Sequence, residues 1–220
     1  MLVPCYRHPW DLSPKEAMEL QRELAKRVIL EDRGDTYRTV AGIDVGIEGK
    51  SARAAVVVMA LPELSIMERV VVERLVTFPY VPGLLSFREA PAILEALARL
   101  QCVPDVLIFD GQGYAHPRRM GIATHVGILL DHPTIGCAKS RLCGTYEEPA
   151  PARGSHTGLW DRGEMIGAIV RTRAGVKPVF VSVGHRIRLD TAISLVMRCA
   201  KGYRLPEPTR WAHRLASGGL

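Results

Sequence analysis

Two aspartates at the ends of apolar segments are the residues of this sequence best suited to metal chemistry. Asp44 lies at the end of a predicted strand in Gly-Ile-Asp-Val-Gly, and Asp110 ends the apolar segment that precedes Gly-Gln-Gly. Burying a lone carboxylate is costly, and two carboxylates side by side repel each other unless a hard divalent cation binds them. Taken singly, each aspartate is better explained as a turn residue near glycine. If the two strands pair, the arrangement favours a metal site.

Glu89 is the third acid that the sequence singles out. It closes the pattern Ser-Phe-Arg-Glu at residues 86–89, which is typical of a capping box at the start of a helix. The same helix leads into the strand that ends at Asp110, which would bring Glu89 to the cleft of the two aspartates. The residues alone leave a capping role and a metal-binding role equally open.

A short loop with two prolines and an aromatic residue follows the third predicted strand. Pro79 and Pro82 stiffen this loop, and Tyr80 lies between them. A rigid apolar loop of this kind can insert between bases and unstack them, or it can pack on its own core. Gly111 and Gly113 also have two interpretations. They could let the backbone approach a base or phosphate closely, or they could simply form a tight turn.

Three more polar residues lie at predicted element boundaries. His116 opens a predicted helix six residues after Asp110, and a lone histidine in such a place is more often structural. Lys139 ends an apolar strand, where its ammonium group could meet a phosphate at the same sheet edge. Asp190 opens a later helix, where a favourable interaction with the helix dipole explains its charge.

The periodicity of apolar residues predicts an α/β protein. A capping box of Ser13 and Glu16 opens the first helix, and three strands with short turns then form an antiparallel meander. The predicted helices cover residues 14–32, 86–101, 117–130, 188–201 and 206–216, and the predicted strands cover 38–45, 52–61, 65–78, 105–110, 133–138, 164–172 and 178–183, with a loop at 144–160. A meander with Asp44, a helix with Glu89 and a parallel strand with Asp110 resemble the ribonuclease H-like fold, a mixed sheet of about five to eight strands flanked by helices.

Composition places the chain among globular proteins and suggests an anionic partner. Of 220 residues, 47% are hydrophobic and 24% are charged, which is typical of one folded domain over residues 1–220. The apolar run at 54–61 is far shorter than the ~20 residues of a membrane-spanning helix, so we expect no membrane association. Five scattered cysteines without a C-x-x-C pattern favour a cytoplasmic location. Residues 138–220 hold 14 lysines and arginines against 6 acidic residues, which indicates either a nucleic-acid partner or a solvated basic surface.

Several motifs, in the order in which they occur, resemble those of the endonuclease V family. The matching segments are residues 79–83, 86–89, 110–113, 116–119, 133–136, 139–142, 184–186 and 205–210. One such motif would be weak evidence, whereas the full set covers nearly the whole chain and is specific. One departure is visible: Gln112 stands where many relatives carry histidine, which could shift base preference or rate.

The resemblance implies a repair nuclease of ribonuclease H-like fold that recognises deoxyinosine, the product of adenine deamination. Such an enzyme hydrolyses the second phosphodiester bond on the 3′ side of the lesion and leaves a 3′-hydroxyl and a 5′-phosphate. The resemblance further implies Mg²⁺ as cofactor, which Mn²⁺ can replace, and water as the attacking group. It implies single- or double-stranded DNA containing inosine as partner, RNA as a further substrate, and a monomeric state.

The resemblance also assigns roles to residues. Asp44, Glu89 and Asp110 would hold or organise the metal, and His116 and Lys139 would lie near the scissile phosphate. The loop of Pro79, Tyr80, Val81 and Pro82 would fill the space left by the lesion. The pocket for the flipped base would be shaped by Gly83, Leu85, Gly111, Gly113, Ile122, Gly136 and Leu142. Asp190 occupies a position where relatives carry an acid and is a candidate additional acid.

Three alternative functions remain at this point. A ribonuclease of the same family would act mainly on inosine-containing RNA. A protein of another class would bind lesions without cutting them, although the full set of three acids argues against an inactive site. The segment 42–46 resembles the first phosphate loop of actin-like ATPases, but those proteins need a second domain of similar size, for which 220 residues leave no room.

Overall fold

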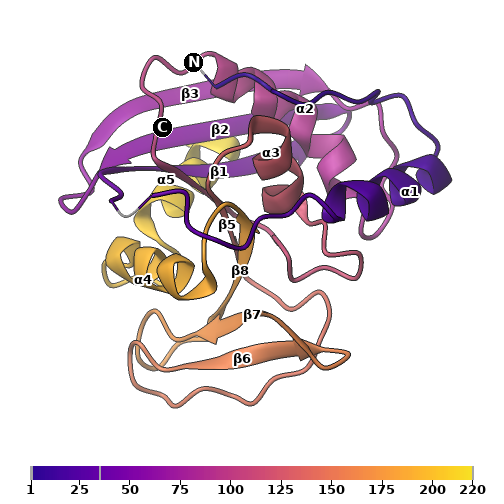
Figure 1. Cartoon of the computed structure of the whole chain (residues 1–220). Helices are drawn as coiled ribbons and strands as arrows, with labels where there is room; N and C mark the ends of the chain where they lie inside the picture. Colours follow the sequence, from indigo (N-terminus) through magenta and orange to yellow (C-terminus); the bar gives the residue numbers. More distant parts are fainter. Residues whose placement is uncertain (1, 35, 220) are drawn as a thin grey trace.

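The computed structural model, which describes residues 2–34 and 36–219, is built on one mixed sheet. Within these residues the sheet has eight strands in the order β3-β2-β1-β4-β5-β8-β7-β6, and five helices accompany it (Figure 1). The strands are β1 Thr39–Glu48, β2 Ser51–Ala60, β3 Ile66–Leu75, β4 Val106–Phe109, β5 Thr134–Ala138, β6 His156–Asp161, β7 Glu164–Val170 and β8 Val179–His185. The helices are α1 Pro14–Ala25, α2 Leu85–Ala98, α3 Ile122–Leu130, α4 Leu189–Cys199 and α5 Glu207–Ala216. The α/β class and the sheet size expected from the sequence are confirmed.

The centre of the sheet brings the two predicted aspartates together. Strands β1, β2 and β3 form the expected antiparallel meander, and β4 pairs with β1 in parallel. In this register Ile43 is the partner of Phe109, and the backbone N–H of Asp110 donates to the carbonyl of Ile43 at 2.9 Å. Asp44 and Asp110 therefore follow paired positions on neighbouring strands, as predicted.

Successive residues of the central strands enter two different cores. On β1, Val40 belongs to the cluster packed against α4 and α5, whereas Ala41 belongs to the cluster packed against α2 and α3. On β2, Val57 and Val56 divide in the same way. Because side chains alternate across a strand, helices must cover both faces of these strands, which is why the strands are continuously apolar.

Helix α5 lies directly against β1, and two glycines allow it. A Cβ atom at Gly42 would overlap the backbone of Pro208 and Thr209, and one at Gly46 would overlap the carbonyl oxygen of Ala216. No larger residue fits at either position without moving the helix. The close contact holds α5 beside the part of β1 that carries Asp44.

Several predicted elements differ in the structure. The strand expected at 38–45 continues to Glu48, so Asp44 lies within β1 rather than at its end. The first helix ends at Ala25 rather than at residue 32, because the backbone of Ile29 bonds to the segment after β8: its N–H donates to Nδ1 of His185, and its carbonyl accepts from Arg186 N–H. The helix expected from residue 117 begins at Ile122, because the preceding residues form turns and Arg119 has a φ of 57°. The loop expected at 144–160 overlaps β6, a strand at the edge of the sheet that pairs with β7 and, through a single bridge at Trp160, with Thr145.

The capping box expected at residues 86–89 is wrong, whereas the one at residues 13–16 is confirmed. At α2 the N-cap is Leu84 and no side chain caps the helix. Ser86 is buried, and its hydroxyl lies 2.9 Å from Nδ1 of the buried His125. This contact removes Ser86 from capping and leaves Glu89 free for another role.

No helix in the described part of the chain is both long and apolar enough to cross a membrane.

Candidate active site

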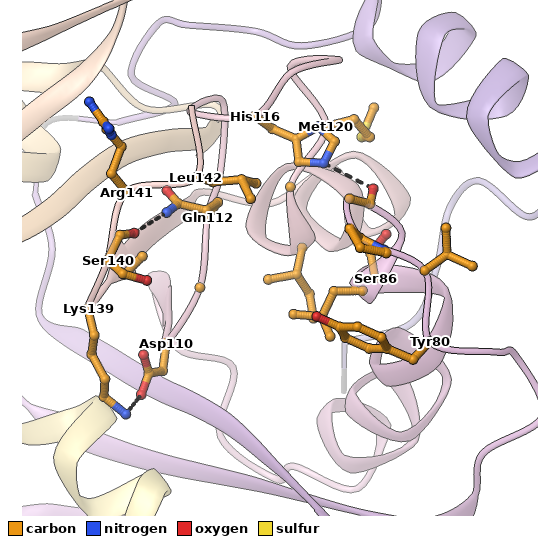
Figure 2. A pocket seen from close by; sticks show the side chains of 18 residues that line it. Tyr80, Ser86, Asp110, Gln112, His116, Met120, Lys139, Ser140, Arg141 and Leu142 are labelled. Carbon is orange, nitrogen blue, oxygen red and sulfur yellow. Dashed lines mark hydrogen bonds and ion pairs between the residues drawn. The ribbon is translucent and has the colours of Figure 1, made fainter. Parts of the chain in front are cut away.

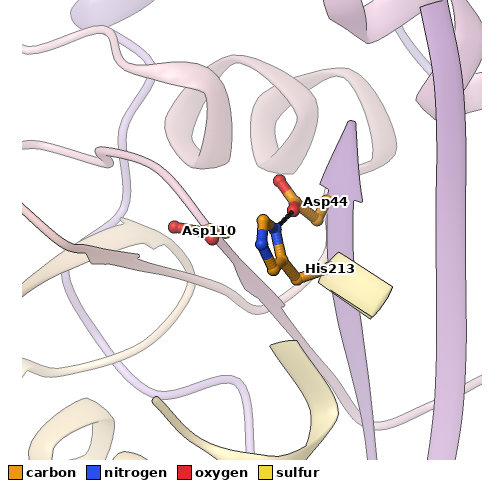
Figure 3. A group of neighbouring side chains, drawn as sticks. All are labelled: Asp44, Asp110 and His213. Atoms are coloured by element: carbon orange, nitrogen blue, oxygen red, sulfur yellow. Dashed lines mark hydrogen bonds and ion pairs between the residues drawn. The ribbon is translucent and has the colours of Figure 1, made fainter. Parts of the chain in front are cut away.

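Two carboxylates and an imidazole converge beside β1, just past the last residue that pairs with β4. One ligand atom from each of Asp44, Asp110 and His213 lies within 4.8 Å of those of the other two (Figure 3). Nδ1 of His213 is 2.7 Å from Oδ2 of Asp44. Strand β1 supplies Asp44, the end of β4 supplies Asp110, and α5 supplies His213. The group is therefore held by elements that pack tightly against one another.

Two further predicted residues line the same cavity. The Nζ atom of Lys139, directly after β5, is 2.5 Å from Oδ2 of Asp110. Glu89 reaches the cavity from α2, as the hypothesis of a metal-binding role requires. Four of the five predicted catalytic residues thus meet here, namely Asp44, Glu89, Asp110 and Lys139.

The surroundings of two acids in this cavity disfavour their charged forms. Burial, and next the charges of Asp44 and Asp110, raise the pKa of Glu89 to about 8. Burial and the charge of Asp110 also raise the pKa of Asp44, although His213 and Lys139 act in the opposite direction. A divalent cation would stabilise the charged forms of both carboxylates, so carboxylate oxygens with one imidazole fit a metal site.

A second, deeper pocket of about 370 Å³ adjoins the acidic cavity (Figure 2). Its size is in the range of small-molecule sites. Leu85, Asp110 and Lys139 line both hollows, so the two are neighbours. The other lining residues are Tyr80, Val81, Pro82, Gly83, Ser86, Gly111, Gln112, His116, Met120, Gly121, Ile122, Ala138, Ser140, Arg141 and Leu142.

Tyr80 lies at the rim of this pocket. Its side chain is 70% exposed although the loop around it is anchored, and the guanidinium of Arg88 is 5.8 Å from its ring centroid. Figure 2 shows Tyr80 and Ser86 on one side of the pocket and Asp110 and Lys139 on the other. An exposed aromatic ring at the mouth of an apolar pocket is placed to contact a ligand that enters it.

Gly113 and Gly136 lie behind the pocket wall rather than in it. A Cβ atom on Gly136 would lie 2.7 Å from the carbonyl carbon of Gln112 and 2.8 Å from the carbonyl oxygen of Gly111. A Cβ atom on Gly113 would lie 2.8 Å from the carbonyl carbon of Val183. The two glycines let β5 and β8 approach the 111–113 loop closely, and so they shape the pocket indirectly. Pro79, likewise, does not line the pocket itself.

His116 lies in the pocket wall, apart from the acidic group. It is 2% exposed, its Nε2 is 3.0 Å from the carbonyl oxygen of Gly83, and its Nδ1 accepts from the N–H of Arg118 at 3.1 Å. Burial and the charge of Arg118 lower the pKa of His116 to about 4, so the ring is neutral near pH 7. Asp190 is also apart, because its side chain is 86% exposed on the first turn of α4, 3.9 Å from Arg188.

His213 is the site residue that the sequence did not reveal. It lies 169 positions from Asp44, on α5, three residues beyond the matching segment 205–210. Buried positions of α5 recur at helical spacing, and His213 falls on the polar face between them, as many surface residues do. Only the docking of α5 on β1 shows what this histidine contacts.

The order of the sheet, with Asp44 within β1 and Asp110 directly after the adjacent β4, defines the ribonuclease H-like class of proteins. Comparison with known proteins narrows this class. The family model of endonuclease V matches residues 22–214, and the chain belongs to this family. An endonuclease V from Roseiflexus sp. (strain RS-1) is 56% identical over 214 residues, which cover 97% of this chain and 96% of the relative.

Solved structures agree with this assignment. The endonuclease V of Streptomyces avermitilis is 42% identical and superposes with a TM-score of 0.91, covering 98% of this chain and 95% of the other. The endonuclease V of Ciona intestinalis is 27% identical with a TM-score of 0.81, covering 93% and 96%. The Ciona protein was crystallised in complex with a 24mer DNA containing an inosine followed by a ribo-adenosine.

Proposed function

We propose that this chain is a repair endonuclease that binds deoxyinosine in DNA and hydrolyses the second phosphodiester bond on its 3′ side, leaving a 3′-hydroxyl and a 5′-phosphate. The observation that supports this most directly is the pair of adjoining hollows. An apolar pocket behind Tyr80 is separate from the acidic cavity, yet the two share Leu85, Asp110 and Lys139. Cutting at a bond away from the recognised base requires such a separation.

The pocket would hold the base after it leaves the helix. Gly83, Gly111 and Ile122 line its wall, where they can contact a purine. Tyr80, together with Pro79, Val81 and Pro82, would occupy the space that the base leaves. A weakened inosine pair lowers the free energy needed for flipping, which contributes to selectivity. His116 would act here, in the pocket wall.

Mg²⁺ is the cofactor we propose, and Mn²⁺ would replace it. Asp44, Asp110 and His213 would hold the ion, with Glu89 beside them. When bound, such an ion favours deprotonation of an attacking water and neutralises charge on the phosphate. Lys139 has a side chain 40% exposed next to Asp110, and its ammonium group can contact the same phosphate. We further propose that the protein acts as a monomer.

A nicking assay tests this proposal. The substrate is a labelled duplex with one deoxyinosine, and we expect a single cut at the second 3′ bond with Mg²⁺ and none with chelator. Asp110→Ala should abolish cutting while keeping inosine-specific binding, whereas Glu63→Ala, in the exposed turn after β2, should cut like the wild type. Cutting by Asp110→Ala at the wild-type rate would refute the metal assignment.

The same assay addresses the remaining alternatives. Faster cutting of a matched inosine-containing RNA would make RNA the main substrate. Binding by the wild type without any cutting would favour a lesion-binding protein. Membership of the endonuclease V family removes the actin-like ATPase interpretation of residues 42–46.

A further inference from the structure

One backbone carbonyl in the loop of Tyr80 receives an unusual number of hydrogen bonds. The carbonyl oxygen of Gly83 lies 3.0 Å from Nε2 of Gln21, 3.0 Å from Nε2 of His116 and 2.8 Å from Nη2 of Arg118. Gly83 has a φ of 79°, which favours glycine, and it ends the rigid segment that begins at Pro79. The loop is therefore fixed at the point where it turns into α2.

Gln21 is the unexpected member of this group. It lies on α1 and is 1% exposed, between the buried apolar residues Ala17 and Leu24 of the same helix. Its Nε2 donates to the carbonyl oxygens of Gly83 and Met120, at 3.0 and 3.1 Å. Its Oε1 accepts from Nε of Arg118 at 2.5 Å. Every polar atom of the carboxamide is thus used, and its orientation is fixed.

The hydrogen bonds of His116 and Arg118 also converge on the carbonyl oxygen of Gly83. The carbonyl of Gly83 can only accept, so Nε2 of His116 carries the proton and Nδ1 accepts from the N–H of Arg118. Arg118 in turn bonds both to Gln21 and to Gly83. The three side chains form one network whose common partner is the loop.

Gln21 is the one polar residue among the buried positions of α1. The neighbouring buried positions of α1 are filled by apolar residues, and burying an amide is favourable only when all its hydrogen bonds are made. Gln21 lines neither hollow and belongs to no group of acids. What its burial provides is a fixed carbonyl at the end of the loop of Tyr80.

We propose that Gln21 is a positioning residue that holds the loop of Tyr80 rigid while a base pair is opened. This inference rests on the proposed function. A loop that separates stacked bases must not yield when it meets them, and the network anchors it from α1 and from the turn at 116–118. An inosine in a single strand has no pairing partner to displace. The loop matters less there, so the defect of a Gln21 variant should be specific to duplex DNA.

The test compares kcat/KM on duplex and on single-stranded DNA containing one deoxyinosine. Gln21→Met keeps the size of the side chain and removes all three hydrogen bonds. We expect kcat/KM on the duplex to fall about tenfold to a hundredfold, with little change on the single strand. Gln21→Glu retains the acceptor for Arg118 but loses both donors, and we expect the same duplex-specific defect.

A matched control separates positioning from stability. Leu24→Ala, one turn along α1, removes a buried side chain that packs near Met120 and Ile128, so it should lower the melting temperature at least as much as Gln21→Met. We expect it to keep the wild-type ratio of duplex to single-strand activity. A 2-aminopurine placed beside the inosine, measured in chelator, should brighten with the wild type and with Leu24→Ala but much less with either Gln21 variant.

The outcomes separate this inference from the proposed function. Equal losses on both substrates, unchanged duplex activity of Gln21→Met or Gln21→Glu, or a duplex-specific defect in Leu24→Ala would each overturn it. Failure of the wild-type protein to nick either substrate would instead refute the proposed function.

Discussion

Replacing Gly136 by alanine should deform the pocket from behind. The new Cβ atom would lie 2.7 Å from the carbonyl carbon of Gln112 and 2.8 Å from the carbonyl oxygen of Gly111, and closer still to the backbone nitrogen of Gly113. Ordinary contact begins at 3.4 Å, so the loop at 111–113 must move by about 0.7 Å or more. Backbone on both sides leaves no flexible side chain to give way.

This displacement sets the size of the expected effect. Overpacking a buried site costs about 1–3 kcal/mol of folding stability, and a shift approaching 1 Å in a recognition wall can lower activity by up to about a hundredfold. We expect Gly136→Ala to lower the free energy of unfolding in urea by that amount and to lose more in kcat/KM on the inosine duplex than stability explains.

Gly34→Ala is the matched control, because nothing lies within 4 Å of a Cβ atom at that position. It should behave like the wild type in both assays. If Gly136→Ala were as stable and as active as Gly34→Ala, the wall formed by residues 111–113 would not depend on its contact with β5. The account of Gly113 and Gly136 as indirect shapers of the pocket would then be wrong.

Two further predictions concern pH. Burial raises the pKa of Glu89 to about 8, so the metal-free folded protein keeps a proton that the unfolded chain releases near pH 4, and its stability should fall as the pH rises between those values. In chelator, Glu89→Gln should therefore melt above the wild type near pH 8 and level with it near pH 4, and equal melting at both values would contradict the buried-acid account. The hydrogen bonds from Arg186 lower the pKa of Asp131 to about 2. The charged carboxylate therefore stabilises the fold fully above its unfolded pKa of about 3.9, and this contribution is lost as the pH falls through about 2. Asparagine suits the left-handed backbone at this helix end, so Asp131→Asn tests the charge alone. In urea unfolding at pH 7 the variant should lose about 1 kcal/mol of folding stability, a small value because the site is partly exposed, and the loss should vanish towards pH 2.

The central sheet could be predicted because its signals are local and strong. Asp44 and Asp110 each come directly after a run of buried residues, and a meander followed by a helix and a buried strand leaves few ways to pair β1 with β4. The edge strand β6 was harder to predict from the sequence, because it is short and polar and follows a segment rich in proline and glycine. Sheet pairing with β7, rather than its own composition, makes it a strand.

Tertiary contacts also decided the details that the sequence left open or hid. Ser86 has the spacing of a capping residue, but its hydroxyl contacts His125, 39 positions away. The last predicted turns of α1 give way to bonds with residues 185 and 186. Gln21 and His213 carry no motif, and each gains its importance from a partner far along the chain. Such roles are visible only when both partners are in place.

The docking of α5 on β1 makes the acid–histidine group of Asp44, Asp110 and His213 depend on a contact between the two ends of the chain's fold. Asp44 and His213 are 169 positions apart, and they meet only because Gly42 and Gly46 let the helix lie against the strand. A chain whose sheet has formed but whose α5 is still detached has two carboxylates and no histidine. Assembly of the acid–histidine group is thus tied to completion of the tertiary structure, and the proposed metal site is complete only once the last helix has docked.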